Sequence, residues 1–490
     1  MFELMIPLDT GSKKPLYEQI YDYIRRNITD GKISRGEKLP STRLLAGNLQ
    51  ISRSTVESAY EQLLSEGYIE SKRGSGYYVG DISELYFCSR FAGQKTEKKK
   101  TAGCRTKEAF LDREKYRIVF SPEENEFAYF PYNAWRRITR EVLAADDPSL
   151  FLTGEAAGEM ELREAVCSYL YRARGVNCDP KQMIVGAGNE YLLMLLVQIL
   201  GGKRKVAAEN PTYLKAYRTL LNMGCEMVPV RMDKSGICME DIKEQNPEIV
   251  YVMPSHQFPM GTVMPMKRRL ELLQWAKERQ GRYIIEDDHD SEFRYRGKPV
   301  PSLQGSDAGG TVIYIGTFSK SISPSVRVSY MVLPETLLDA YDANCGFYAP
   351  TVPKEQQKVL AAFLNQGCFE RYLNKMRRIY KTKRDVFLAL LKKESWVRTI
   401  YGDGAGMHLL VELKTEKSGT QVVREAAAKG IRVYDLEEYR ILDPGKQENR
   451  FPTLLLGYGA LSEEEMREGI SCLREIVSIQ SEHTISGRFG

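Results

Sequence analysis

The sequence lacks any apolar segment long enough to cross a membrane. Its longest apolar run, residues 191–200, is interrupted by Gln198 and falls well short of the roughly 20 residues that a spanning helix needs. The first residues also lack the basic start and apolar block of a secretory signal peptide. Both absences argue against a membrane or exported protein, and we expect a cytoplasmic one.

Cysteine pairing has equally little support. The nine cysteines are odd in number and widely scattered, and they include no Cys-x-x-Cys pair. This usage is typical of reduced thiols in a cytoplasm, and it disfavours both a disulfide framework and a zinc site. We therefore expect no metal.

Length and composition set broad limits. At 490 residues the chain is too long for one ordinary hydrophobic core, so two or more domains are expected. Hydrophobic residues make up 42% and charged residues 28%, as in ordinary globular proteins. The formal net charge of +5 is too mild to indicate nucleic-acid binding by itself.

The pattern of residues 13–80 predicts a small unit of three helices and a hairpin. A first helix ends near Asp30-Gly31, Ser41 is a candidate N-cap of a second, and Ser52 or Ser54 caps a third. The expected inward-facing residues are Leu16, Ile20, Tyr23 and Ile24, then Leu44, Leu45 and Leu49, then Val56, Tyr60, Leu63 and Leu64. Strands at 68–71 and 77–79 flank a basic glycine turn. Together these elements predict a winged helix-turn-helix.

Several residues of this unit suit contact with DNA. Arg53, at the start of the third helix, offers the donor fork that matches guanine in the major groove, and Arg43 could reach the same groove or its flank. The remaining candidates suit the phosphate backbone and are Ser52, Ser54, Thr55, Lys72, Arg73, Gly74 and Gly76. The alternative is a surface domain with ordinary charges.

Residues 81–115 are polar and have few apolar anchors, which predicts a flexible linker. The run Lys98-Lys99-Lys100 lies inside it. We interpret that run as solvated rather than as a specific contact.

From residue 116 to 480 strands and helices alternate, which predicts a mostly parallel sheet with helices on both faces. The expected strands are 182–185, 205–208, 249–253, 283–285, 312–315 and 329–332. A smaller α+β part is expected from about residue 360, with strands at 408–411 and 453–456.

Two of these strands end in residues that suit pyridoxal 5'-phosphate. Lys320 follows the strand at 312–315, where a lysine points into the crevice of an α/β sheet and can form a Schiff base. The strand at 283–285 runs into Glu286-Asp287-Asp288, and a protonated ring nitrogen is a partner for such carboxylates. Asp287 is the first choice for that contact, Asp288 the second, and a divalent-metal site the alternative.

The phosphate and ring also have candidate partners. Arg327 can pair with a phosphate, and Gly188, Asn189 and Glu190 begin a helix whose backbone N–H groups can bind one. The Glu190 carboxylate itself does not favour phosphate. The nearby hydroxyls are Thr317 and Ser319, and the candidate for stacking on the ring is Tyr213, for which simple packing is the alternative.

The N-terminal motifs resemble those of the GntR-type winged helix. The matching segments are 15–17, 39–44, 52–56, 67–69 and 74–77. The resemblance implies that Arg43, Arg53 and Gly76 contact DNA.

Residues 116–480 resemble the fold-type I aminotransferases. The matching positions are Gly158, Leu162-Arg163, Gly188, 211–213, Pro254, 259–261, 286–288, Ser319-Lys320, Pro324 and Arg327. The whole chain is thus similar to MocR-type regulators, which resemble a dimeric aminotransferase with DNA-binding arms. The resemblance implies that Lys320 carries the cofactor, Asp287 holds its nitrogen and Arg327 binds its phosphate.

The chain departs from these families at the site. His289 stands where a tyrosine usually meets the phenolic oxygen of the cofactor. A histidine could donate the same hydrogen bond, and its protonation near neutral pH would make the cofactor sensitive to pH. The alternative is a histidine that is merely packed in its loop. Phe258 stands where many aminotransferases have asparagine. Lys215 and Arg450 are our two candidates for an effector carboxylate.

Two functions fit these observations. In the first, a homodimeric regulator reads an operator with two half-sites and senses pyridoxal phosphate, an amine, or both through an external aldimine. In the second, the chain is a working aminotransferase with a DNA-binding arm, in which Lys320 is also the catalytic acid and base. The resemblance favours regulation.

Overall fold

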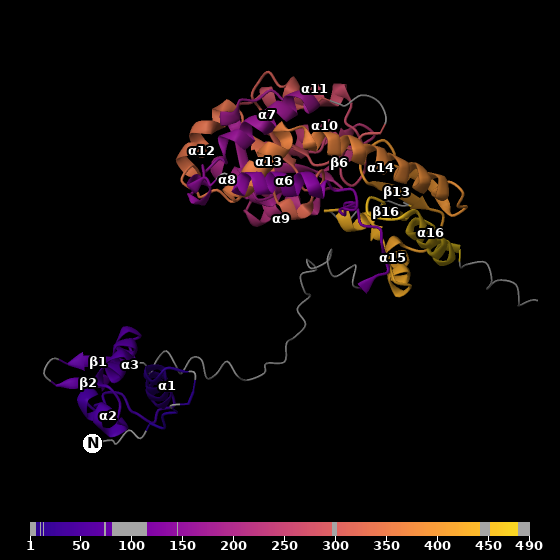
Figure 1. Cartoon of the computed structure of the whole chain (residues 1–490). Coiled ribbons are helices and arrows are strands. Elements are labelled where there is room, and N and C mark those ends of the chain that lie inside the picture. Colours follow the sequence, from indigo (N-terminus) through magenta and orange to yellow (C-terminus); the bar gives the residue numbers. More distant parts are fainter. Residues whose placement is uncertain are drawn as a thin grey trace, which may run out of the picture. The chain divides into compact units, whose positions relative to one another are not determined.

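The computed structural model describes residues 6–9, 11–12, 14–72, 75–80, 115–144, 146–295, 301–441 and 451–478. They fall into two compact units that divide between residues 105 and 106, both drawn in Figure 1. No helix in these ranges combines the length and apolar composition needed to cross a bilayer.

The N-terminal unit is a winged helix-turn-helix, as predicted. Its described elements are α1 (Leu16–Thr29), α2 (Thr42–Leu49), α3 (Arg53–Ser65), β1 (Ile69–Lys72) and β2 (Gly76–Val79). The Ser41 hydroxyl accepts the N–H of Leu44 in the first turn of α2, and the Ser52 hydroxyl accepts that of Thr55 in the first turn of α3. Ser52 rather than Ser54 is therefore the cap. The strands β1 and β2 pair antiparallel to form the wing.

One inward-facing residue was assigned wrongly. Leu44 is 43% exposed, because the buried face of α2 passes through Thr42, Leu45 and Ala46. Leu44 lies about 100° around the helix from Leu45 and so points away from the core. Leu49 and Leu64, by contrast, do face the core, but they lie at its edge and are half-buried.

The C-terminal unit is built on a large mixed sheet. Its described residues form eight strands in the order β4-β11-β10-β9-β8-β5-β6-β7. The run from β10 to β6 is parallel, whereas β11 is antiparallel to both of its neighbours and β7 is antiparallel to β6. The strands are β4 (Met183–Gly186), β5 (Lys205–Asn210), β6 (Glu226–Asp233), β7 (Gly236–Ile237), β8 (Ile249–Val252), β9 (Tyr283–Asp288), β10 (Val312–Thr317) and β11 (Ser329–Val332).

Helices cover both faces of this sheet, as predicted. Tyr314 of β10 packs in one cluster with α7, α13 and α14, while its neighbours Ile313 and Ile315 pack in another with α8 and α9, since alternate residues of a strand face opposite sides. The helices are α6 (Tyr132–Leu143), α7 (Met160–Arg174), α8 (Asn189–Ile199), α9 (Leu214–Asn222), α10 (Met239–Gln245), α11 (Met266–Lys277), α12 (Leu338–Asn344), α13 (Lys354–Asn365) and α14 (Cys368–Leu391).

Strands β6 and β7 were not predicted. Strand β6 carries Pro229 and has a partly exposed pattern, because only the short β7 lies beyond it in the sheet. Proline and exposure both weaken the signal of a buried strand. Near an edge of the sheet they are tolerated.

A second, smaller sheet has the order β12-β13-β16-β15. The long helix α14 contributes its first half to the cluster of the large sheet and its last turns to the cluster of the small one, and it runs toward β13 and β16 in Figure 1. The elements are β12 (Val397–Tyr401), β13 (His408–Leu413), β15 (Tyr434–Asp435), β16 (Thr453–Gly457), α15 (Gly419–Ala428) and α16 (Glu463–Ser478). The short strand β3 (Ile118–Val119) pairs with β14 (Ile431–Arg432) beside them. The domain boundaries near 80, 115 and 360 stay predictions, and the predicted linker lies almost wholly outside the described residues.

Candidate cofactor site and DNA-reading surface

One cavity lies at the carboxyl ends of β9 and β10. It brings together ten predicted site residues, namely Asn189, Glu190, Tyr213, Lys215, Asp287, His289, Thr317, Ser319, Lys320 and Arg327. Its other lining residues are Glu123, Met253, Phe258 and Pro324. This is the edge at which parallel α/β sheets bind ligands.

Lys320 lies in the turn after β10, with its amine at the cavity. Its Nζ donates a hydrogen bond to the carbonyl oxygen of Pro122 at 2.8 Å. Burial lowers the pKa of Lys320, although the carboxylates of Glu123 and Asp290 act in the opposite direction. A lysine with a lowered pKa is more often neutral, the form that attacks a carbonyl carbon.

The two neighbouring aspartates of β9 face different partners. Asp287 lines the cavity and accepts a hydrogen bond from the Tyr251 hydroxyl at 2.5 Å, with the Asn189 amide at 3.4 Å. Asp288 instead pairs with Arg174 at 2.7 Å and accepts from the Tyr314 hydroxyl at 2.6 Å. Burial raises the pKa of Asp287, while His289 lowers it. The geometry thus favours Asp287 over Asp288 for a ring nitrogen.

The acidic run of β9 does not converge on one point. Glu286 accepts the backbone N–H groups of Leu303 and Gln304, each at 2.8 Å, and burial raises its pKa to about 7. With Asp288 held by Arg174, each of the three carboxylates has its own partners. The arrangement disfavours the divalent-metal alternative, because metal ligands must share one centre.

The start of α8 and Arg327 form the other end of the cavity. Gly188 precedes the helix with φ at 106°, and a Cβ there would lie 2.3 Å from Arg327 Nη2. That nitrogen donates to the carbonyl oxygen of Ala187 and pairs with Glu190, both at 3.2 Å. Glu190 therefore faces the same cation that a phosphate would use. Nearby, the Thr317 hydroxyl oxygen accepts from the Ser319 N–H at 3.1 Å and from the Ser329 hydroxyl at 2.9 Å.

Tyr213 and Lys215 line the cavity where β5 leads into α9. The Tyr213 ring meets Phe258 edge to face, with ring centres 5.9 Å apart, and Lys215 Nζ lies 5.9 Å from the centre of the same ring. Lys215 also forms an ion pair with Glu123 at 2.8 Å. Arg450, the other candidate for binding an effector carboxylate, lies outside the described residues.

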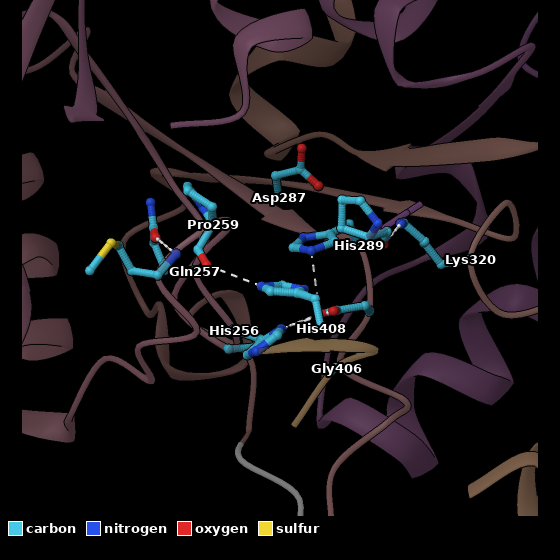
Figure 2. A network of polar contacts seen from close by, with 12 residues as sticks. His256, Gln257, Pro259, Asp287, His289, Lys320, Gly406 and His408 are labelled. Atoms are coloured by element: carbon cyan, nitrogen blue, oxygen red, sulfur yellow. Dashed lines mark hydrogen bonds and ion pairs between the residues drawn. The ribbon is translucent and has the colours of Figure 1, made fainter. Parts of the chain in front are cut away.

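His289 belongs to a cluster of three histidines, which Figure 2 shows close to Lys320 and Asp287. The Asp290 carboxylate accepts a hydrogen bond from His256 Nδ1 at 2.8 Å, and His289 Nε2 lies 3.4 Å from the same carboxylate. Burial alone would raise the pKa of Asp290, but the two histidines hold it well below its usual range. Burial and the neighbouring His256 lower the pKa of His408 to about 3. His408 Nε2 lies 3.0 Å from the Pro259 carbonyl oxygen, so this neutral ring donates there.

The atoms of His256, His289 and Asp290 that could hold a metal lie within 4.8 Å of one another. The hydrogen bond of 2.8 Å between His256 Nδ1 and Asp290 would compete with an ion for the Asp290 carboxylate. We therefore interpret the cluster as a hydrogen-bonded support for His289.

The segment 120–126 was missed by the sequence reasoning. Besides the Pro122 carbonyl and Glu123, it supplies Asn125, whose amide donates to the carbonyl oxygen of Lys320 at 2.9 Å. This segment is separated from Lys320 by almost two hundred positions and carries no recognisable motif. Tyr251 was missed because it sits inside an ordinary buried strand.

The DNA-reading candidates lie on the surface of the N-terminal unit. The Arg53 side chain is 64% exposed and pairs with Glu57 one turn along α3, and Arg43 is exposed on α2. The hydroxyls of Ser54 and Thr55 lie 2.7 and 2.9 Å from Ser52 Oγ.

The wing carries two of the predicted DNA contacts, Arg73 and Gly76, and makes one contact that was not predicted. Gly76 begins β2 with φ at 110°, and Arg73 lies outside the described residues. Lys38 pairs through its backbone with Tyr78, and the amines of Lys38 and Lys72 lie 5.8 and 4.7 Å from the Tyr78 ring centre. The alternation of β2 alone could not reveal this, because Lys38 comes from the loop before α2.

Two family models match the chain. The model of aminotransferase class I and II matches residues 120–455, and that of bacterial regulatory proteins of the gntR family matches residues 16–79. Fold and motifs therefore define a DNA-binding regulator built on an aminotransferase fold.

Relatives extend over nearly the whole chain. The HTH-type transcriptional regulator YdeL of Bacillus subtilis is 40% identical over 94% of this chain and 96% of its own. The probable rhizopine catabolism regulatory protein MocR of Rhizobium meliloti is 34% identical, covering 96% and 95%. The pyridoxine biosynthesis transcriptional regulator PdxR of Corynebacterium glutamicum is 30% identical, covering 97% and 99%. The chain belongs to the MocR-type family of HTH transcriptional regulators.

Solved structures show the same fold in the C-terminal unit. An archaeal alanine:glyoxylate aminotransferase matches with a TM-score of 0.66 at 24% identity, covering 74% of this chain and 90% of that one. LysN, the alpha-aminoadipate aminotransferase of Thermus thermophilus, matches with a TM-score of 0.65 at 25% identity, covering 76% and 95%.

Proposed function

We propose that this regulator binds pyridoxal 5'-phosphate in the cavity at β9 and β10 and uses it to sense an amine. The observation that carries the proposal is that Lys320, Asp287 and Arg327 line a single cavity. These three side chains supply the amine, the carboxylate and the guanidinium that the aldehyde, ring nitrogen and phosphate of the cofactor require.

The local chemistry fits this cofactor. Gly188 leaves room beside Arg327 that a Cβ would fill, so a phosphate can approach the guanidinium and the start of α8. Asn189 Oδ1 is buried with no hydrogen-bond partner among the described residues. When bound, pyridoxal phosphate supplies an aldehyde carbon open to amines and a ring that withdraws electrons.

Each remaining residue has a role in holding the group. Asp287, fixed by Tyr251, would keep the ring nitrogen protonated, and Tyr213 would lie against the ring. His289 would donate to the phenolic oxygen in place of a tyrosine, with Asp290 and His256 fixing its position. Thr317, Ser319 and the first N–H groups of α8 would complete the phosphate site.

Regulation would follow from competition between the effector amine and Lys320 for the cofactor aldehyde. An incoming amine would displace the lysine from the cofactor, and Lys215 or Arg450 would receive an acidic group of that effector. The consequence would reach the DNA through a homodimer, in which two winged helices read two half-sites of an operator in the cytoplasm. Contacts with DNA would come from Arg43, Arg53, Ser54, Thr55, Arg73 and Gly76.

An active aminotransferase is the second candidate. The lowered pKa of Lys320 favours it, because a neutral lysine can also move protons during turnover. Release of a keto acid from added amino acids would establish this activity. If an amine alters the affinity for the operator and no keto acid is released, the chain is a regulator and not an aminotransferase.

The first test of the proposal is the absorbance spectrum of the full-length protein with added cofactor. We expect a band at the edge of the visible region that borohydride converts into a stable label on the Lys320 peptide. The Lys267→Ala protein, altered on the exposed surface of α11, should behave like the parent. A label on another lysine, or no band at all, would contradict the site.

A further inference from the structure

A short segment, residues 120–126, meets Lys320 and Lys215 at the cavity, and its Glu123 lines that cavity. It follows β3, the first described strand of the C-terminal unit, and Glu123 is the cavity-lining residue nearest in the sequence to the DNA-binding unit. We call residues 120–126 the strap. Its position in the sequence makes it the shortest covalent route from the cavity toward the winged helix.

Two contacts join the strap to the lysines that line the cavity. The Pro122 carbonyl oxygen accepts the hydrogen bond of Lys320 Nζ at 2.8 Å. Glu123 meets Lys215 Nζ with both carboxylate oxygens, at 2.8 and 3.2 Å. Elsewhere the strap is held by Asn125, which donates to the carbonyl oxygens of Lys320 and Ser319, by Phe120, which accepts from the Gly457 N–H, and by Glu126, which pairs with Lys383 at 2.9 Å.

The cations that line the cavity already face carboxylates of the chain. Arg327 pairs with Glu190 and Lys215 pairs with Glu123. The proposed function assigns Arg327 to the phosphate and Lys320 to the aldehyde. Among the lining residues that the structure describes, Lys215 is then the cation that the cofactor does not use.

The ion pair of Lys215 and Glu123 can be exchanged. The two side chains are 54% and 39% exposed, and pairs within reach of water stabilise a protein little. A carboxylate delivered by a bound ligand would compete with Glu123 on equal chemical terms. A second ammonium group would gain less, because Lys215 already neutralises Glu123 and would repel it.

We propose that Glu123 holds Lys215 in the place of an acidic group of the effector, so that amines bearing such a group bind selectively and release the strap. This inference rests on the proposed function. Two events then act on the same segment: Lys320 leaves Pro122 when it bonds to the cofactor and is a free amine again once the effector displaces it, whereas Glu123 leaves Lys215 only when the effector arrives. The effector thus breaks the contact of Glu123 with Lys215, while the strap keeps its contacts at Phe120, Asn125 and Glu126.

The test uses the full chain loaded with pyridoxal phosphate and follows its absorbance band. The probes are β-alanine, propylamine and 1,3-diaminopropane, with the homologues of each that are one and two carbons longer. We expect the amino acids to perturb the band at lower concentration than the amines or diamines of equal length. Lys215→Gln should remove that preference.

Removing the Glu123 carboxylate, which competes with the effector for Lys215, should strengthen binding of the effector. Glu123→Gln should bind the acid-bearing amines up to about fivefold more tightly, since an exposed ion pair contributes up to about 1 kcal/mol. Glu141→Gln is the matched control, because it breaks an exposed pair with Arg137 on α6 that does not line the cavity. It should leave the titrations unchanged.

Hydrogen–deuterium exchange gives a readout independent of the band. The backbone amides around Glu123 should exchange faster once an acid-bearing amine is bound, and Glu123→Gln should raise their exchange without it. A preference for diamines that Glu123→Gln abolishes would overturn the proposal and make Glu123 an ammonium site. Equal response to all three probe classes would overturn it too, while a normal band would leave the proposed function intact. Absence of any band would defeat both.

Discussion

The two units expose their candidate functional residues in opposite ways. In the winged helix, Arg53 is 64% exposed and its partner lies on the same helix. In the cavity, Asp287 is 3% exposed and depends on Tyr251, which comes from a different strand. A surface residue therefore needs little more than its helix, whereas a cavity residue needs the whole sheet.

The difference also appears within a single strand. Asp287 and Asp288 are adjacent and equally buried, yet one lines the cavity and the other is paired with Arg174. Burial therefore does not separate a site carboxylate from a structural one. The two carboxylates are separated by the face of the strand on which each lies, because that face decides which partner each one meets.

The largest expected effect comes from removing the cofactor lysine. Lys320→Ala should lose the reducible absorbance band completely, because no amine remains to bond the cofactor, while circular dichroism and binding of the operator by the winged helix persist. A borohydride label that survives in this variant would place the bond on another residue.

The paired aspartates should separate stability from binding. Asp288→Ala should lower the free energy of unfolding by about 3 kcal/mol, because it leaves the buried Arg174 without its carboxylate. Asp287→Ala should instead weaken cofactor binding with a smaller loss of stability. Denaturant unfolding followed by tryptophan fluorescence suits this comparison, since Trp135, Trp275 and Trp396 all lie in the C-terminal unit. Equal losses of stability would refute the division of roles.

The winged helix should show effects on binding alone. Arg53→Ala should weaken binding to the operator by about 1–3 kcal/mol if its guanidinium reads a guanine, with no change in the unfolding of the C-terminal unit. Titration of the operator and of an unrelated duplex measures the two affinities. The same loss on both would make Arg53 a phosphate contact.

The smallest effect concerns pH. Burial raises the pKa of Glu209 on β5 to about 8, so between about pH 4.5 and 8 the folded protein binds more protons there than the unfolded chain. Stability must then fall as pH rises through that window. Relative to Glu209→Gln, the parent should lose about 1 kcal/mol per pH unit near neutrality. If the free energies of unfolding of the parent and of Glu209→Gln follow parallel curves at all pH values, this carboxyl titrates normally.

Local signals were enough to predict the winged helix. The caps at Ser41 and Ser52 and the spacing of Ile20, Ile24, Val56 and Tyr60 act within a few residues, and the structure has the helices there. Leu44 was misplaced because a run of two leucines does not state which one faces the core. Strand β6 was missed because Pro229 and exposure near the sheet edge hide its pattern.

The cavity was predicted where a residue follows directly from the end of a strand, as Lys320 and Asp287 do. Glu123, Asn125 and Tyr251 could not be found in this way. They reach the cavity through contacts between segments far apart in the sequence, and no spacing records such contacts. The wing contact of Lys38 with Tyr78 escaped for the same reason.

The most direct test of the account is operator binding by the full chain, loaded with pyridoxal phosphate, with and without an amine that perturbs its absorbance band. The account predicts that the amine changes the operator Kd by about fivefold or more, the lower range of ordinary allosteric coupling, and that Lys320→Ala abolishes the change. An operator Kd that is the same with and without the amine, while the band responds fully, would contradict it.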